Sequence, residues 1–260
     1  MQVRLDKLRN RRPNQRPAAP PRRPEPAAEP ARVGASVEIH DVFRIFRESD
    51  VETVALRGLD LGVAPGEYVA IMGRSGSGKS TLLNLVAGSD RPSAGAIRID
   101  GVEVGQASEE TRTALRGRTV AHVIQAGNLV EFLSLAENVA LAASLAGVSL
   151  TDGDIRDALD RVALAALAAR RPSQLSGGEQ QRAALALALA TRPRLLLAVE
   201  VTGELDHRTA AAVLDTIDRL RRTTPMTILA ATHDPAVAAR ADRVVEIVDG
   251  RLRGVAEGAR

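Results

Sequence analysis

The feature that most constrains the fold of this 260-residue chain is the segment GRSGSGKS at residues 73–80. It fits the pattern G-x-x-x-x-G-K-[ST], in which successive backbone N–H groups and one lysine cradle the phosphates of a nucleotide. The chain has only two lysines, Lys7 and Lys79. A chance match is therefore expected on the order of once in a thousand such chains, and the segment predicts a phosphate-binding loop.

The residues on both sides of this loop predict the structural context that it needs. Residues 67–72 have the apolar texture of a buried strand that leads directly into the loop. Residues 81–87 have helical spacing and are followed by Gly88, a residue typical of a helix C-terminus. In a strand–loop–helix unit the loop amides and the positive end of the helix point at one place, which favours phosphate.

Composition limits the classes of function. The chain contains no cysteine, which excludes a disulfide framework and a thiolate metal site or nucleophile. The net charge is +6 over residues 1–35 and −3 over the remainder. The only aromatic residues are Phe43, Phe46, Tyr68 and Phe132. Because bases would find few stacking platforms and the globular part is mildly acidic, no specific nucleic-acid partner is expected.

Residues 1–35 hold seven of the thirteen prolines, mixed with Arg, Ala and Glu, and predict a disordered tail. This tail is interpreted as a solvated spacer, with a basic arm near anionic lipid or RNA as the alternative. No apolar run approaches 18 residues, and no apolar stretch follows the N-terminal charges. We therefore expect neither a membrane span nor a signal peptide, and any membrane association through a partner.

The remaining pattern predicts an α/β fold with three parts. Alternating segments predict a small antiparallel sheet at residues 37–39, 51–56 and 95–101. Continuous apolar runs predict central parallel strands at residues 195–199 and 227–232, and a short, mostly apolar run predicts a further strand at residues 119–124. Residues 244–248, followed by Asp-Gly, predict a closing hairpin. Residues 134–190 are mainly helical, with Thr151 as a helix cap, and His122 is interpreted as a structural strand residue.

The sequence QLSGGEQQR at residues 174–182 precedes a long Ala/Leu-rich helix. Its glycine amides, its hydroxyl and the helix dipole predict a second anion site. This segment resembles the signature of ATP-binding-cassette ATPases, and the other motifs stand in that family's order. The resemblance covers about residues 36–252. The segments at 74–84, 137–139 and 202–206 are similar to cassettes of the lipoprotein-release and macrolide-export type.

The resemblance implies a P-loop NTPase core with a parallel sheet, a small antiparallel β-subdomain and a helical signature subdomain at about residues 126–190, all within a domain of residues 36–260. It also implies two cassettes that sandwich two ATP molecules, each bound by the loop of one subunit and the signature of the other. The expected cofactors are ATP and Mg²⁺. The expected partners are an integral membrane permease and a second cassette, in a homodimer or a heterodimer, at the cytoplasmic face of the cell membrane.

Individual roles follow from the resemblance. The residues expected to hold the phosphates are Gly73, Ser75, Gly76, Ser77, Gly78, Lys79, Ser80 and Thr81. The residues expected to meet the nucleotide across the dimer are Ser176, Gly177 and Gly178, with Asp206 in the segment that links the two sites. Ser80 and Gln125 would ligate Mg²⁺, and Phe46 would stack on adenine. The expected catalytic residues are Glu200 as general base, His233 at the γ-phosphate and Gln125 at the attacking water.

Each of these residues also has an ordinary interpretation when taken alone. Phe46 would more often pack in a core, His233 would be a strand-end histidine, and residues 176–178 would form a turn. Five motifs in one order favour the family over these separate interpretations.

One segment departs from the family pattern. In most relatives the strand at residues 195–199 ends Leu-Leu-Ala-Asp-Glu-Pro-Thr, whereas this chain has Val199 in place of the aspartate that holds Mg²⁺ and Val201 in place of the proline. This degenerate Walker B segment keeps Glu200. Because phosphoryl transfer depends on charge neutralisation by Mg²⁺, we expect ATP binding to survive and hydrolysis to be slowed.

Two other functions remain open at this stage. The chain could be an ATP-binding switch, or the degenerate partner in a heterodimer, with little hydrolysis of its own. A non-transport cassette of DNA repair or translation is less favoured, because such proteins carry a long coiled-coil insertion or two fused cassettes, and this chain has neither.

Overall fold

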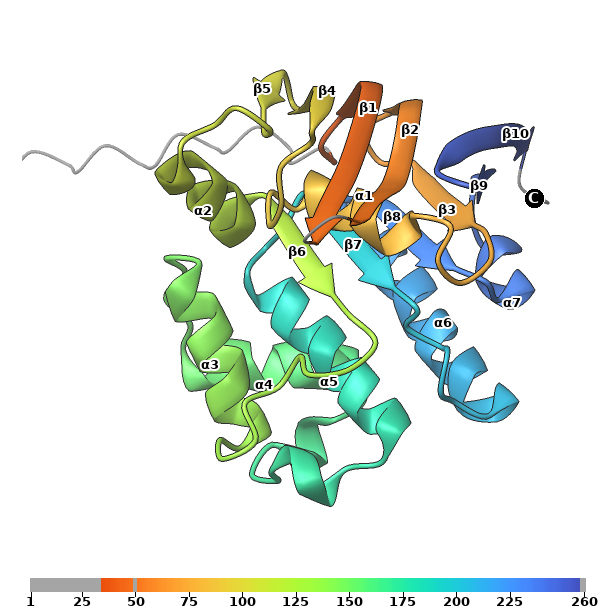
Figure 1. Ribbon diagram of the computed structural model, residues 1–260. Helices are drawn as coiled ribbons and strands as arrows, with labels where there is room; N and C mark the ends of the chain where they lie inside the picture. The colour runs from red at the N-terminus through yellow and green to blue at the C-terminus, as the bar shows by residue number, and fades with distance from the viewer. Residues whose placement is uncertain (1–33, 49–50, 258–260) are drawn as a thin grey trace, which may run out of the picture. The chain divides into compact units, whose positions relative to one another are not determined.

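Two β-sheets organise residues 34–48 and 51–257, the part of the chain that the computed structural model describes. The larger sheet has the strand order β10-β9-β3-β8-β7-β6, in which β9 through β6 are parallel and β10 pairs antiparallel with β9 (Figure 1). Its strands are β3 Tyr68–Met72, β6 Val120–Val123, β7 Leu195–Val199, β8 Thr227–Thr232, β9 Arg243–Val248 and β10 Arg251–Glu257. The predicted α/β class, the central parallel strands and the closing hairpin are confirmed.

The smaller sheet is antiparallel, as predicted, with the order β2-β1-β4-β5. Its strands are β1 Val37–Glu48, β2 Val51–Val63, β4 Ala94–Ile99 and β5 Val102–Glu103. β1 and β2 are much longer than the sequence pattern predicted. Cross-strand pairing continues to the polar end of the hairpin, where Arg47 forms a 2.8 Å ion pair with Glu52, and register shifts along β1 interrupt the regular alternation.

The larger sheet is covered on both faces, and alternate residues of its strands serve the two layers. In β7, Leu195, Leu197 and Val199 face the cluster that includes α1 (Lys79–Val86) and the smaller sheet. Leu196 and Ala198 face the cluster built from the helices that follow β6. Continuous apolar runs are therefore required in the central strands.

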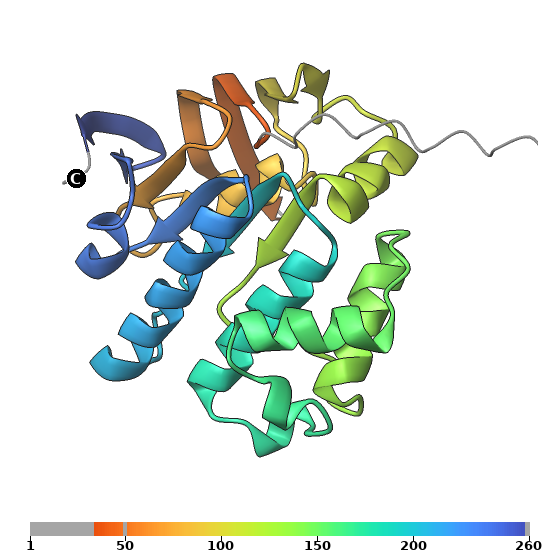
Figure 2. The same ribbon diagram turned by 180° about the vertical axis from the view of Figure 1, so that it is seen from behind.

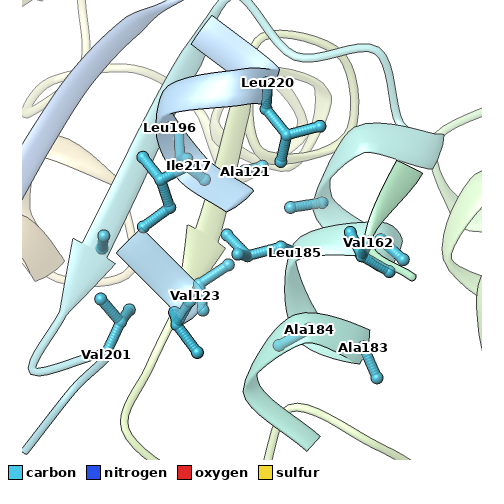
Figure 3. Packing of buried hydrophobic residues seen from close by; sticks show 14 of the residues in the cluster. Ala121, Val123, Val162, Ala183, Ala184, Leu185, Leu196, Val201, Ile217 and Leu220 are labelled. Carbon is cyan, nitrogen blue, oxygen red and sulfur yellow. The ribbon is translucent and has the colours of Figure 1, made fainter. Parts of the chain in front are cut away.

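The second layer is helical. Its helices are α3 Leu135–Leu145, α4 Asp152–Arg161, α5 Gly177–Ala190, α6 His207–Thr223 and α7 Pro235–Ala238, with short 3₁₀ turns at Ala165–Leu167 and Pro172–Gln174. In contrast, α2 Glu109–Arg118 packs through Leu115 against the cluster that includes α1. Figure 2 shows α6 lying over the larger sheet on the side away from α1. Figure 3 shows Ala121, Val123 and Leu196 of the sheet packed with Leu185 of α5 and Ile217 of α6. This packing joins the helical region to the strands that carry the site.

Side-chain caps begin the helices in this layer. Ser134, Thr151 and Ser176 form capping boxes with the residue three positions later, and Asp206 caps α6. Each cap satisfies backbone N–H groups that have no partner within the helix. The predicted cap at Thr151 is confirmed.

The predicted tail over residues 1–35 lies outside the described residues except for its last two positions. Gly34 and Ala35 are buried, and the Ala35 N–H donates to the Arg194 carbonyl at 3.0 Å. The Thr227 hydroxyl donates to the Ala35 carbonyl at 2.6 Å. These two residues belong to the packed domain because they bond across the ends of β7 and β8, so the folded region begins before residue 36.

Candidate nucleotide-binding site

The loop between β3 and α1 closes around Lys79. The Lys79 side chain is buried, and its Nζ donates to the Gly73 carbonyl at 2.7 Å and to the Arg74 carbonyl at 3.1 Å. Gly78 is the N-cap of α1 and has φ 108°, a left-handed conformation that a β-carbon would strain. The lysine therefore lies at the centre of a ring of loop backbone, at the positive end of a helix.

Packing shows why glycine recurs in this loop. A β-carbon at Gly78 would lie 2.6 Å from the Ala55 carbonyl oxygen of β2, and one at Gly73 would lie 2.6 Å from Ser77 Oγ. Gly76, in contrast, has no neighbouring heavy atom within 4 Å of such a carbon and faces open space. The Ser77 hydroxyl is buried without a hydrogen-bond partner. A cradle with one open side, an inward cation and an unsatisfied hydroxyl fits the phosphates of a nucleotide.

Glu200 and His233 lie beside the same lysine. Glu200 Oε1 is 3.7 Å from Lys79 Nζ, and Glu200 Oε2 is 3.0 Å from His233 Nδ1. Glu200 Oε2 is buried and has no hydrogen bond of good geometry, whereas the His233 side chain is largely exposed. The strand order brings these residues together, because β7 and β3 both pair with β8 and end at the same edge of the sheet.

Glu200 has an unusual backbone. Its φ is 49°, in the left-handed region that non-glycine residues rarely adopt. The Glu200 N–H donates to the Ala231 carbonyl at 2.9 Å, and the Glu200 carbonyl accepts from the Gly203 N–H at 3.0 Å. These two bonds turn the chain sharply after β7 and direct the carboxylate toward Lys79.

Val199 occupies the position at which an aspartate would place a second carboxylate in the site. It is 9% exposed and belongs to the cluster on the α1 face of the sheet. A charged group at this position would therefore point toward the helix that carries Ser80. In this chain that position is apolar.

The donor set for Mg²⁺ is small but fits the ion. Ser80 is exposed in the first turn of α1, and the Gln125 amide supplies a second neutral oxygen. Within residues 34–48 and 51–257, no three His, Cys, Asp or Glu side chains gather to hold a metal ion. Mg²⁺ commonly keeps several waters and takes one or two protein ligands beside substrate phosphates, so Ser80 and Gln125 would be its protein ligands.

Gln125 is held by residues on other elements. The Gln125 Nε2 donates to Glu204 Oε1 at 2.9 Å. The backbone carbonyl of Gln125 accepts a hydrogen bond from the side-chain amide of Gln181 in α5. Because a carboxylate only accepts, the first bond assigns Nε2 to the Glu204 side and Oε1 to the side that a cation would meet. A β-carbon at Gly203 would lie 3.6 Å from Glu200 Cβ and 3.7 Å from Gln125 Nε2, so the amide lies close to the candidate base.

The signature segment begins α5. The Ser176 hydroxyl accepts from the Glu179 N–H, and the Glu179 carboxylate accepts from the Ser176 N–H at 2.8 Å and from the Ser176 hydroxyl at 2.9 Å. The backbone and then the hydroxyl bond lower the pKa of Glu179 below its ordinary value. Gly177 and Gly178 occupy the first turn of α5, which begins away from α1 (Figure 1).

Asp206 begins α6 as its cap. Its carboxylate accepts from the Arg208 and Thr209 N–H groups at 3.0 and 3.1 Å and from the Thr209 hydroxyl at 2.6 Å. These bonds, the hydroxyl bond first, lower the pKa of Asp206. Both of its carboxylate oxygens are engaged in hydrogen bonds within the chain.

The ring of Phe46 is 38% exposed near the tip of the β1–β2 hairpin. The Arg44 guanidinium lies 4.4 Å from the ring centroid, and Arg44 Nε donates to Asp90 Oδ2 at 2.7 Å. The Phe46 ring is therefore partly exposed, with a cation over it.

Several contacts of the site were not found from the sequence. They are the Lys79–Glu200 ion pair, the Gln125–Glu204 hydrogen bond, the Thr202–Asp234 hydrogen bond of 2.9 Å and the Arg44–Phe46 contact. No local signal could have found the first three, because each joins segments 32 to 121 positions apart, whereas Arg44 is two residues from Phe46 on one face of a strand. His122, interpreted as structural, lies in β6, where burial lowers its pKa.

No described helix is both long enough and apolar enough to cross a bilayer.

Comparison with known families places the site in context. The family model described as ABC transporter matches residues 56–203, which include residues 73–80, Gln125, the signature segment and Glu200. Phe46, Asp206 and His233 lie outside the matched range.

Two relatives and one solved structure are closely similar. The macrolide export ATP-binding/permease protein MacB of Syntrophobacter fumaroxidans is 43% identical over 218 residues, or 82% of this chain, but the match spans only 30% of that relative. The lipoprotein-releasing system ATP-binding protein LolD of Anaeromyxobacter dehalogenans is 42% identical over 227 residues, or 86% of this chain and 94% of the relative. The ATP-binding cassette MJ0796, solved as a dimer in a post-hydrolysis state with ADP and Pi, has a TM-score of 0.80 and 30% identity, covering 86% of this chain and 99% of that one.

Proposed function

The chain belongs to the ABC transporter family of ATPases, and on this premise we propose that it is the ATP-binding and ATP-hydrolysing subunit that drives a membrane permease or mechanotransmission partner. One observation carries this proposal. Lys79, Glu200 and His233 come from three separate segments and meet beside one glycine-rich loop. The Glu200 carboxylate lies 3.7 Å from Lys79 Nζ and 3.0 Å from His233 Nδ1.

We infer the roles of these residues from their positions. Lys79 exchanges its bonds to the loop carbonyls for phosphate oxygens of ATP, assisted by the loop amides. Glu200 holds and polarises the attacking water through its carboxylate, and His233, whose side chain is largely exposed, lies 3.0 Å from the Glu200 Oε2 atom. Mg²⁺, when bound, neutralises phosphate charge in the transition state, and Ser80 and Gln125 would hold it.

A second cassette completes the site in this proposal. Ser176, Gly177 and Gly178 start a helix whose N-terminus lies away from α1, so they are available to a nucleotide bound by another subunit. The dimeric state of the similar cassette MJ0796 supports this arrangement. Phe46 would take the adenine ring on its open face.

Hydrolysis is slowed in this proposal because Val199 supplies no charge to the metal. Val199 is also the observation that favours the second candidate, an ATP-dependent switch with little turnover. Binding depends on Lys79 and the loop amides, which are complete, whereas turnover also needs the cation held in place. The two candidates differ only in rate and are separated by measuring turnover with the membrane partner present.

We place the protein at the cytoplasmic face of the membrane, bound peripherally through an integral partner. The surface on both sides of Gln125 suits such a contact, because Ile124 is 39% exposed and Phe132 is 73% exposed. Copurification of the full chain from membranes, with identification of the bound integral protein and ATPase assay of the complex, tests the proposal. Recovery of the chain without an integral membrane protein and without ATP binding would refute it.

A further inference from the structure

The first turns of α5 and α6 touch at a glycine. Gly178 is buried, and a β-carbon added there would overlap the Thr209 methyl carbon Cγ2. The same carbon would lie 3.5 Å from Thr209 Cβ and 3.8 Å from Arg182 Nη1. One residue earlier, a β-carbon on Gly177 would lie 3.4 Å from Leu205 Cδ2. The start of the signature helix therefore rests on the segment that begins α6.

Thr209 cannot move its methyl group away without breaking other bonds. Its hydroxyl donates to Asp206 Oδ2 at 2.6 Å, and its N–H donates to Asp206 Oδ1 at 3.1 Å. Rotation about χ1 to another staggered position would remove the hydroxyl from Asp206. The cap of α6 thus fixes the methyl group against the Gly178 backbone.

We propose that Thr209 is a positioning residue that sets the height of the signature helix N-terminus over the α6 N-terminus. Glycine is then required at position 178 for packing within its own chain, because any β-carbon would prevent this close approach. This requirement adds to any contact with a nucleotide. The two helix starts move as one unit, so the amides of Gly177 and Gly178 keep a fixed place relative to the turn that follows Glu200. The inference rests on the proposed function, because these amides act on the site of a second cassette.

The matched pair of substitutions is Gly178→Ala and Thr209→Ser. Serine keeps the hydroxyl that bonds Asp206 and lacks only the methyl group that the new β-carbon would meet. If the contact sets the position of the signature helix, Gly178→Ala lowers stability and dimerisation in the chain that keeps Thr209. The same substitution is then tolerated in the Thr209→Ser background. If Gly178→Ala instead obstructs a bound nucleotide, Thr209→Ser gives no rescue.

The experiment uses the full chain carrying Glu200→Gln, which removes the candidate base so that bound ATP persists. Urea unfolding of the free chain and ATP-driven dimerisation by size-exclusion chromatography are measured for the parent, both single variants and the double variant. We expect Gly178→Ala to weaken dimerisation about tenfold or more and to lower the urea midpoint, as overpacking in a tight contact does. The double variant should return to within about threefold of the Thr209→Ser chain.

Three outcomes decide the inference. Rescue in both measurements supports it. Absence of coupling between the two substitutions in urea unfolding overturns the contact, and rescue of unfolding without rescue of dimerisation overturns the positioning role. If the parent chain itself does not dimerise with ATP, the homodimeric form of the proposed function fails, and the unfolding coupling alone decides the contact.

Discussion

Val199→Asp is expected to raise Mg²⁺-dependent ATP turnover by about 10²-fold, within the range of about 10²–10³ that one electrostatic contact to the transition state contributes. The direction follows from the structure. Val199 points to the α1 face of the sheet, so a carboxylate there would lie on the side of the helix that carries Ser80. It would add a charged anchor to a cation whose expected protein ligands, Ser80 and Gln125, are both neutral.

The same substitution is expected to destabilise the free chain. Val199 is only 9% exposed, so the change removes buried apolar surface and buries a carboxyl group. Loss of the valine side chain costs about 1.5 kcal/mol, and burial of the polar group raises the total cost to about 2–4 kcal/mol. Turnover must therefore be measured at a temperature well below the melting transition of the variant, with unfolding by urea recorded in parallel.

Val199→Asn is the matched control, because asparagine has nearly the shape of aspartate and removes the same apolar group without adding a charge. It should lose comparable stability and leave turnover close to that of the parent. The assay is phosphate release with Mg²⁺ varied at saturating ATP, in the presence of the copurified membrane partner. If the folded Val199→Asp chain binds ATP and turns over no faster than Val199→Asn, the explanation of slow hydrolysis by a missing carboxylate is wrong.

The remaining predictions concern other contacts of the site and the core. Glu204→Ala removes the acceptor that orients the Gln125 amide, and the Mg²⁺ concentration for half-maximal turnover should rise about fivefold, as expected for one lost hydrogen bond; Glu204→Gln, which can pair with either end of the amide, should show a smaller rise. Because the pKa of Glu179 is lowered from its ordinary value of 4.5, this carboxylate stabilises the fold at pH values above 4.5. The contribution disappears as the pH falls through the lowered pKa. The urea concentration at the unfolding midpoint should therefore decrease as the pH is lowered below about 4.5. This decrease should be less steep in Ser176→Ala, which removes only the hydroxyl bond. Leu159→Ala empties a fully buried position and should lower the free energy of unfolding by about 2–5 kcal/mol in urea titrations.

The segments that could be predicted from the sequence are those whose structure is determined locally. The strand, loop and helix around Lys79 were predicted at residues 67–72, 73–80 and 81–87, and the structure has β3 at Tyr68–Met72 and α1 at Lys79–Val86. The apolar run at 195–199 coincides with β7, because a strand buried on both faces has no polar interruptions. In each case short-range pattern and local conformation point to one answer.

The arrangement of side chains around the site could not be predicted in the same way. The motifs indicated that Lys79, Glu200 and Gln125 serve one site, but not that Glu200 pairs with the lysine while Gln125 pairs with Glu204. These pairings depend on the strand order and on the sharp turn at Glu200, where φ is 49°. Likewise, the pattern S-G-G predicted a helix start with exposed amides, and only the packing of α5 on α6 shows what Gly178 meets within the chain.

In the proposed dimer, Val199 and the Gly178–Thr209 contact would act on different sites. Val199 packs on the α1 face of the sheet in its own chain, so it would limit the site that contains this chain's Lys79. Gly178 lies in the first turn of α5, whose N-terminus lies away from that loop, so its contact with Thr209 would affect the site of the other subunit. Consider a mixed dimer of one Val199→Asp chain and one Gly178→Ala chain. The loop beside the added carboxylate would face the damaged signature, and the loop beside Val199 would face the intact signature. Turnover would therefore rise at neither site. Placing both substitutions on one chain and pairing it with the parent would instead combine the added carboxylate with an intact signature, and only this second dimer should turn over faster.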